Sequence, residues 1–191
     1  MAGGGVQGAD VTRLAGVIGD GIRTFVEAPL PIVAAVHGAV AGGGLGLMLA
    51  ADYLVAGERA KFVSKYADIG LTPDLGVTTL LPAAIGQRRA LELLLQDRTL
   101  SASEALDWGL VAEVVADPAA RAVEVAQHWL DGATEAFGQA ARLVRVGAGR
   151  SFQENLDDEA ATIGRAFDTP EAGRRVAAFA AASAKSKKDP S

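Results

Sequence analysis

Residues 32–51 place a short apolar run, a glycine-rich turn and a second apolar run directly after one another. The first run, Ile32–Val36, lies between a proline and a glycine, which is typical of a buried strand in a sheet covered on both faces. The second run, residues 45–51, predicts a buried helix that begins immediately after the glycines. A strand that leads through a tight turn into a helix indicates an α/β or α+β fold.

The rest of the chain continues this pattern and then becomes helical. Apolar residues recur every three or four positions over residues 11–25, which predicts an amphipathic helix with Asp10 as its N-terminal cap. Residues 64–76 are irregular. Further strands are predicted over 53–56, 60–63 and 110–115. Further helices are predicted over 77–85, 88–95, 104–108, 118–131, 133–147, 151–167 and 170–183.

Composition narrows the classes of function. The chain has 191 residues, enough for one domain, and its net charge of −5 argues against a general nucleic-acid binder. It has no cysteine, so thiolate chemistry and disulfides are excluded, and its two histidines are far apart in the sequence. No apolar run is long enough to span a membrane and no signal peptide is evident, so we expect a cytoplasmic protein.

The turn Ala41-Gly42-Gly43-Gly44 is the strongest local signal. Glycines allow a ligand to approach the backbone closely, and a helix that begins there has N–H groups without partners. These properties suit an oxyanion hole or an anion site, although a tight structural turn explains the glycines about as well. The spacing does not fit a dinucleotide fingerprint or a phosphate-binding P-loop.

Asp74 is the second candidate, in the segment Thr72-Pro73-Asp74-Leu75-Gly76. An aspartate after a proline and before a helix is usually a cap or turn residue. The functional alternative is a general base in apolar surroundings, which raise the pKa of a carboxylate.

Three ordered segments resemble the enoyl-CoA hydratase/isomerase (crotonase-like) family. They are PIVAAVHGAVAGGGLGLMLAADYLVAGERAKF, IGLTPDLGVTTLLPAAIGQRRALELLL and LSASEALDWGLVAEVV. The resemblance implies a spiral of β-β-α units, incomplete at the N-terminus, with a helical C-terminal third. It divides the single domain into a partial spiral core at 1–117 and a helical trimerisation region at 118–191. Implied partners are an acyl-CoA thioester and further copies of the chain in a homotrimer or hexamer. From the net charge and the apolar runs, we expect no nucleic acid and no membrane as partner.

The resemblance also implies an oxyanion hole of two backbone N–H donors around the thioester carbonyl. Gly43 matches the donor in the glycine turn, and Gly4 matches the donor in an earlier loop. If Gly4 is matched correctly, the chain begins at that loop, and the strands that precede it in the family are absent. Further positions matched to substrate binding are Ala41, Gly42, Gly46 and Tyr66. The basic positions that contact the phosphates of coenzyme A in the family fall on Ala182 and Ser183 here, so Lys185, slightly later, is the candidate in their place, although a solvated tail explains it at least as well. No cofactor is implied, because coenzyme A is part of the substrate.

Hydratases of the family carry two glutamates, and the matching positions here are Gly46 and Tyr66. Asp74 matches a catalytic aspartate in some isomerases of the family. We therefore expect an enoyl-CoA double-bond isomerase that uses Asp74 as acid and base. Dehalogenase or thioesterase chemistry with Asp74 as nucleophile ranks second and hydratase chemistry third. A non-catalytic acyl-CoA-binding or structural subunit is the alternative of another class.

Overall fold

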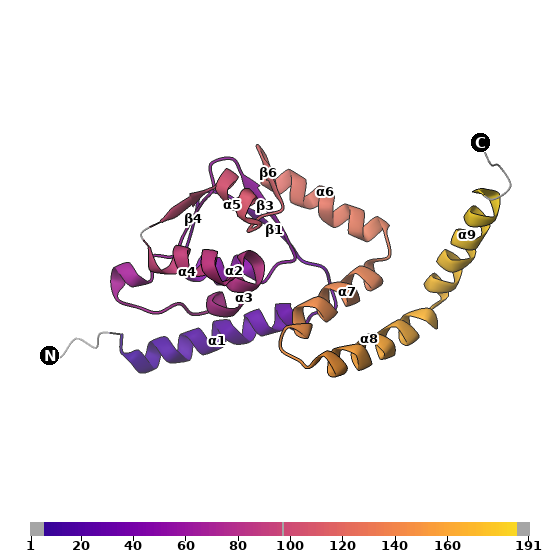
Figure 1. The fold of residues 1–191 in the computed structure, drawn as a ribbon, viewed down its shortest axis with the longest axis horizontal. Helices are drawn as coiled ribbons and strands as arrows, with labels where there is room; N and C mark the ends of the chain where they lie inside the picture. The colour runs from indigo at the N-terminus through magenta and orange to yellow at the C-terminus, as the bar shows by residue number, and fades with distance from the viewer. Residues whose placement is uncertain (1–5, 97, 187–191) are drawn as a thin grey trace. The chain divides into compact units, whose positions relative to one another are not determined.

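The computed structural model describes residues 6–96 and 98–186, with the side chains of residues 185 and 186 outside that description. The chain divides into two compact units, Met1–Arg142 and Leu143–Ser191. Figure 1 shows the order of the elements along the chain. The strands are β1 (Val33–Val36), β2 (Ala39–Ala41), β3 (Tyr53–Gly57), β4 (Lys61–Val63), β5 (Thr99–Ser101) and β6 (Glu113–Val115). The helices are α1 (Gly8–Glu27), α2 (Gly43–Leu49), η1 (Ala67–Ile69), α3 (Val77–Ile85), α4 (Gln87–Leu95), α5 (Ala102–Trp108), α6 (Pro118–Asp131), α7 (Thr134–Gly147), α8 (Phe152–Phe167) and α9 (Pro170–Ser186).

Two three-stranded sheets form the centre of the first unit. One has the order β1-β3-β6 and is parallel throughout. The other has the order β2-β4-β5, in which β2 and β4 are parallel and β4 and β5 are antiparallel. β1 and β2 follow one another in the chain but lie in different sheets, so the chain changes sheet just before the glycine turn. This change of sheet places the turn at the end of β2, beside the end of β4.

The core of the first unit is filled mainly by aliphatic side chains, together with Met48, Phe62 and Tyr66. Phe62 of β4, Leu45 of α2 and Leu81 of α3 are fully buried, as are Leu93 of α4 and Leu100 of β5. α3 packs against both α2 and α4, and Figure 1 shows the three helices grouped together. Because α2 and α3 are in contact, the loop before α3 lies close to the start of α2.

The elements agree closely with those predicted, and the mixed helix-and-strand fold is confirmed. Two strands were not predicted: β2 and β5 have three residues each and owe their extended form to pairing with β4. The predicted cap at Asp10 is wrong, since α1 begins at Gly8 with Gln7 as its N-cap. Asp10 completes a capping box instead, and its carboxylate accepts a hydrogen bond from Gln7 N–H at 3.2 Å. The predicted division into 1–117 and 118–191 stays a prediction. None of the helices in the described part of the chain combines the length and apolarity needed to cross a lipid bilayer.

The Glu113 carboxylate joins β6 to β3 and α6 through hydrogen bonds. Arg121 of α6 donates to both oxygens of Glu113, from Nε at 2.7 Å and from Nη2 at 2.8 Å. The hydroxyl of Tyr53 on β3 donates a hydrogen bond to the same carboxylate at 2.6 Å. The Arg121 guanidinium and the Tyr53 hydroxyl lower the Glu113 pKa to about 2. These contacts therefore link β3, β6 and α6 through one ionised group.

Replacing Glu113 with glutamine is expected to lower the free energy of unfolding at neutral pH, and to lower it less in acid. Because the Glu113 pKa is depressed in the folded chain, the carboxylate contributes its full stabilisation above the ordinary pKa of 4.5. That contribution is lost as the pH falls through about 2. Urea unfolding of both chains at about pH 7 and about pH 3 measures the difference. Glu124→Gln is the matched control, because Glu124 also contacts Arg121, at 3.0 Å, but is exposed. An equal loss at both pH values would contradict the assignment.

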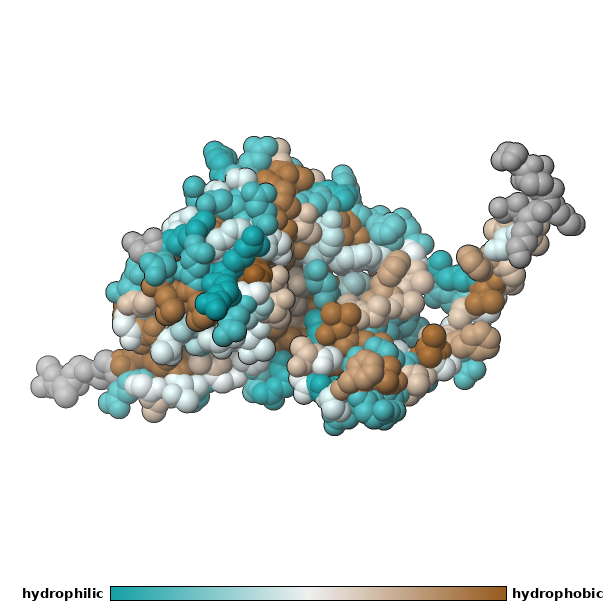
Figure 2. Space-filling model, viewed as in Figure 1, coloured by the Kyte–Doolittle hydropathy of each residue, from teal (hydrophilic) through white to brown (hydrophobic). Residues whose placement is uncertain are grey.

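The second unit consists of the end of α7 together with α8 and α9. Ser151 caps α8 in a capping box with Glu154. Large apolar side chains of these helices remain at the surface, among them Phe152 (80% exposed), Phe167 (70%) and Phe179 (75%). Figure 2 shows brown, apolar side chains along this part of the chain. Exposed apolar surface of this kind is typical of a face that another surface covers.

Candidate functional site

The glycine turn between β2 and α2 has the geometry that its sequence predicts. Gly42 adopts φ 52° and ψ −127°, a conformation that residues with a side chain rarely adopt. Its N–H donates to the carbonyl oxygen of Ser64 at 3.0 Å, so the pairing of β2 with β4 continues one residue beyond the strands. Gly43 is the first residue of α2, and its N–H has no acceptor within the helix. The turn thus presents a backbone donor at a helix N-terminus, where the helix dipole favours negative charge.

Leu75 packs against the start of α2 and explains why positions 43 and 46 are glycines. A Cβ atom on Gly43 would lie 2.8 Å from Leu75 Cδ1, and one on Gly46 would lie 2.4 Å from the Leu75 carbonyl oxygen. Both distances are shorter than the contacts that real Cβ atoms make. Leu75 itself has φ 52°, in the left-handed region that costs a non-glycine residue energy. Packing against α2 therefore holds Leu75, and with it the segment around Asp74, in a backbone conformation that leucine does not favour.

The side chain of Asp74 is held by Tyr66. The Tyr66 hydroxyl donates to Asp74 Oδ1 at 2.6 Å. Tyr66 is 8% exposed, whereas Asp74 is exposed. Burial and the bond to Asp74 raise the pKa of Tyr66 to about 12, so the phenol keeps its proton at neutral pH.

Asp74 is not the helix cap that its position in the sequence first indicates. α3 begins after Gly76, which is in the left-handed conformation, and no side chain caps the helix. Only the backbone carbonyl of Asp74 takes part, accepting from Val77 N–H at 3.1 Å. The Asp74 carboxylate is thus left for Tyr66 and for solvent.

The structure brings most of the predicted site residues together. Ala41, Gly42 and Gly43 form the turn, and Gly46 lies one helical turn further along α2. Leu75 packs against this helix. Its neighbour in sequence, Asp74, is hydrogen-bonded to Tyr66. The two remaining predicted residues cannot be placed: Gly4 and the side chain of Lys185 lie outside the described residues. Leu75 was missed as a site residue, because its role depends on a contact with α2 that no local pattern encodes.

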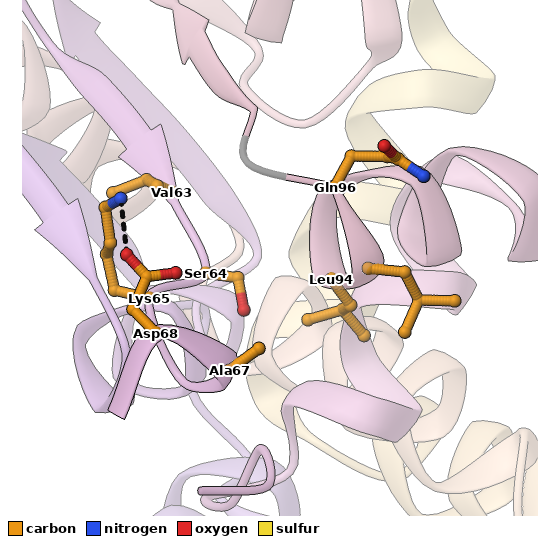
Figure 3. A pocket seen from close by; sticks show the side chains of 8 residues that line it. Val63, Ser64, Lys65, Ala67, Asp68, Leu94 and Gln96 are labelled. Carbon is orange, nitrogen blue, oxygen red and sulfur yellow. Dashed lines mark hydrogen bonds and ion pairs between the residues drawn. The ribbon is translucent and has the colours of Figure 1, made fainter. Parts of the chain in front are cut away.

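A pocket of about 250 Å³ lies beside this site, between the end of β4 with η1 and the last turn of α4. Figure 3 shows Ser64 and Ala67 on one side and Leu94 on the other, with Lys65 and Asp68 paired with each other. The Lys65 ammonium lies 2.7 Å from Asp68 Oδ2. Neither Asp74 nor Gly43 lines this pocket, so the candidate catalytic groups lie outside it.

The described residues contain no group of three or more histidine, aspartate or glutamate side chains placed to hold a metal ion. The groups that the site offers are a carboxylate, a neutral phenol and a backbone donor. A carboxylate can take and return a proton, and a backbone donor can stabilise a developing oxyanion.

Comparison with known proteins identifies the kind of protein that shares these features. A family model described as enoyl-CoA hydratase/isomerase matches residues 7–184. 4-Chlorobenzoyl coenzyme A dehalogenase-1 of Arthrobacter sp. is 33% identical over 160 residues, which are 83% of this chain and 58% of the relative. The 1,2-epoxyphenylacetyl-CoA isomerase of Escherichia coli K12 is 35% identical over 140 residues, 72% of this chain and 53% of the relative. A probable enoyl-CoA hydratase of Rhodobacter capsulatus is 33% identical over 165 residues, 83% of this chain and 62% of the relative.

Solved structures point to the same family. An enoyl-CoA hydratase/isomerase from Cupriavidus metallidurans CH34 matches with a TM-score of 0.84 at 34% identity, covering 92% of this chain and 67% of that one. An enoyl-CoA hydratase from Bacillus anthracis matches with a TM-score of 0.85 at 28% identity, covering 92% of this chain and 69% of that one. The chain spans a little over half the length of the curated relatives that it matches.

Proposed function

Because the chain belongs to the enoyl-CoA hydratase/isomerase family, we propose that it acts on an acyl-CoA thioester and moves a double bond within the acyl group. The observation that carries this proposal is the Asp74 carboxylate, held by Tyr66 and joined through Leu75 to the turn that contains Gly43. One carboxylate that can take and return a proton is sufficient for double-bond migration, whereas water addition by the family's usual route uses two.

In the proposed reaction Asp74 removes a proton from carbon 2 of a 3-enoyl ester. The electrons move into the thioester, and the oxygen gains the negative charge of an enolate. Gly43 N–H donates to that oxygen, with Gly4 N–H as the expected second donor. Asp74 then returns the same proton to carbon 4, the double bond settles between carbons 2 and 3, and no other reactant is consumed. Ala41, Gly42 and Tyr66 would line the acyl group, and Lys185 would contact the phosphates of coenzyme A.

Space around Gly46 supports isomerisation over hydration. A hydratase glutamate at this position would need room where the Leu75 carbonyl oxygen lies, 2.4 Å from the site of the missing Cβ. The second hydratase position is Tyr66, whose phenol has a pKa of about 12 and remains neutral. Neither position therefore offers an ionised group to activate water.

Dehalogenation is a second candidate, and the likeness to two 4-chlorobenzoyl coenzyme A dehalogenases of Arthrobacter sp. favours it. In that reaction Asp74 would attack the ring carbon that bears chlorine and chloride would leave. Water would then hydrolyse the ester between the ring and the aspartate, which regenerates the carboxylate and releases 4-hydroxybenzoyl-CoA. Release of chloride from 4-chlorobenzoyl-CoA would identify this activity directly.

Calorimetry with a panel of 2-enoyl and 3-enoyl esters of coenzyme A tests the first proposal, followed by ultraviolet absorbance of the conjugated product. Binding and conversion of a 3-enoyl ester to its 2-enoyl isomer would support the isomerase. A product with added water would show a hydratase instead. Binding without any conversion would indicate a non-catalytic acyl-CoA-binding subunit. A folded sample that binds none of the esters would contradict the proposal.

We also propose that copies of the chain associate through the C-terminal helices, as a homotrimer or hexamer. The exposed phenylalanines of α8 and α9 support this proposal, because separate monomers would leave them in water. Phe167→Asp is expected to shift the chain toward monomers in light scattering. Val17→Asp on α1 is the matched control, since Val17 is similarly exposed (65%) but lies in the other unit and outside residues 118–191. A wild-type chain that is monomeric at every concentration would contradict the assembly.

A further inference from the structure

We propose that Tyr66 is a positioning residue for Asp74: its hydroxyl holds Oδ1 of the carboxylate and leaves Oδ2 to take and return the substrate proton. This inference rests on the proposed isomerisation. It goes beyond that proposal by assigning separate tasks to the two carboxylate oxygens and by giving the phenol a role other than lining the acyl group.

The need for such a residue follows from the surroundings of Asp74. The carboxylate is exposed and sits in the loop that connects η1 to α3. Among the side chains of the described residues, the Tyr66 hydroxyl is its hydrogen-bond partner. Without this bond the carboxylate is free to rotate between rotamers, and a base that spends little time in the reactive geometry loses rate.

Tyr66 is well placed to supply that order, because it is itself fixed. Its side chain is buried. Its backbone carbonyl accepts hydrogen bonds from Leu71 N–H at 3.0 Å and from Ile69 N–H at 3.3 Å. Two residues earlier, the Ser64 carbonyl accepts from Gly42 N–H at 3.0 Å. The segment that carries the phenol is thus bonded directly to the glycine turn that carries the proposed oxyanion donor.

The distance of 2.6 Å is typical of a hydroxyl that donates to an ionised carboxylate. Since burial and Asp74 raise the pKa of Tyr66 to about 12, the phenol remains a donor throughout the neutral and mildly alkaline range. A phenol that keeps its proton cannot act as a second base. The role that remains for the Tyr66 hydroxyl is therefore to position Asp74, not to transfer protons. The competing explanation is that the ring only fills space, and phenylalanine would fill that space equally well.

Tyr66→Phe separates the two explanations, because it removes the hydroxyl and keeps the ring. We expect kcat for a 3-enoyl ester to fall about 10- to 100-fold, the range for a hydrogen bond to a charged group, while KM changes less than about 3-fold. The matched control is Tyr53→Phe, which removes a hydroxyl bonded to Glu113 at the same 2.6 Å but on β3. The control is expected to keep wild-type kcat. Wild-type kcat in folded Tyr66→Phe would overturn the inference, and so would an equal loss in both variants.

A second measurement does not depend on turnover. The chain has two tyrosines, so the Tyr53→Phe background leaves Tyr66 as the single phenol to titrate by its ultraviolet absorbance. Its midpoint is expected near 12. Adding Asp74→Asn should lower that midpoint, since the bond to the carboxylate is one cause of the raised pKa, while burial keeps it above the ordinary value of 10.0. A midpoint that does not respond to Asp74→Asn would overturn the inference. A midpoint that responds in a chain without isomerase activity would contradict the proposed function and leave the pair in place.

Discussion

Asp74→Asn is expected to reduce isomerisation of a 3-enoyl ester by about 10²- to 10⁴-fold, the usual contribution of a general acid and base. Asparagine keeps the shape of the side chain and still offers an oxygen to the Tyr66 hydroxyl, but its amide cannot take a proton from carbon 2. Binding of the ester, measured by calorimetry, should therefore change little. The same substitution would leave a purely binding subunit unaffected in every measurement.

Asp68→Asn is the control for that experiment. Asp68 lies six residues earlier, is also exposed, and contacts Lys65 at 2.7 Å instead of Tyr66. We expect it to retain nearly all activity. Equal losses of activity in both variants would show a general effect of charge near the site. Full activity in Asp74→Asn would contradict the assignment of Asp74 as the base.

Gly46→Ala is expected to reduce both stability and turnover, because the added methyl group meets backbone. The new Cβ would lie 2.4 Å from the Leu75 carbonyl oxygen and 2.8 Å from Leu75 Cβ, so either α2 or the Asp74 loop must move. Overpacking of this kind typically costs about 1–3 kcal/mol. Movement of the loop also displaces Asp74 relative to the glycine turn. Urea unfolding and steady-state kinetics of the same preparation measure the two effects.

Gly44→Ala is the matched control, since its Cβ would lie 3.8 Å from Val40 Cγ1, an ordinary contact. A double variant sharpens the test further. Leu75→Ala should relieve the cost of Gly43→Ala, where the clash is with the Leu75 side chain at Cδ1, but should not relieve that of Gly46→Ala. Relief at both positions, or wild-type behaviour of Gly46→Ala, would contradict the described packing.

Local patterns were sufficient to predict most of the fold. The three- and four-residue periodicity of α1 and the capping-box spacing before α5 are encoded within a few residues, so their helices agree with the predictions. β2 and β5 were missed because three residues carry too little periodicity, and their extended form depends on β4, which for β5 lies far away in sequence. At the site, too, contacts that depend on tertiary packing could not be predicted from local patterns.

The glycine turn and Asp74 were identified as candidates from their own segments. The bond from Tyr66 to Asp74 and the contact of Leu75 with α2 were not, because each joins segments through tertiary packing. The left-handed backbone of Leu75 is the clearest case, since leucine does not favour this conformation and only the surrounding structure imposes it. Sequence therefore indicated which groups carry the proposed chemistry, and structure was needed to see how they are held.

The backbone of Leu75 also restricts how this site can change over generations. A glutamate at position 46 would bring its Cβ to 2.4 Å from the Leu75 carbonyl oxygen, so we expect the substitution to destabilise the chain before its carboxylate can contribute. A chain that acquired a second carboxylate at this position would first have to move the loop before α3, for example by shortening it or by replacing Leu75 with a residue that allows another backbone path. We therefore expect the order of mutations to matter, with a change in the loop before α3 preceding any glutamate at position 46.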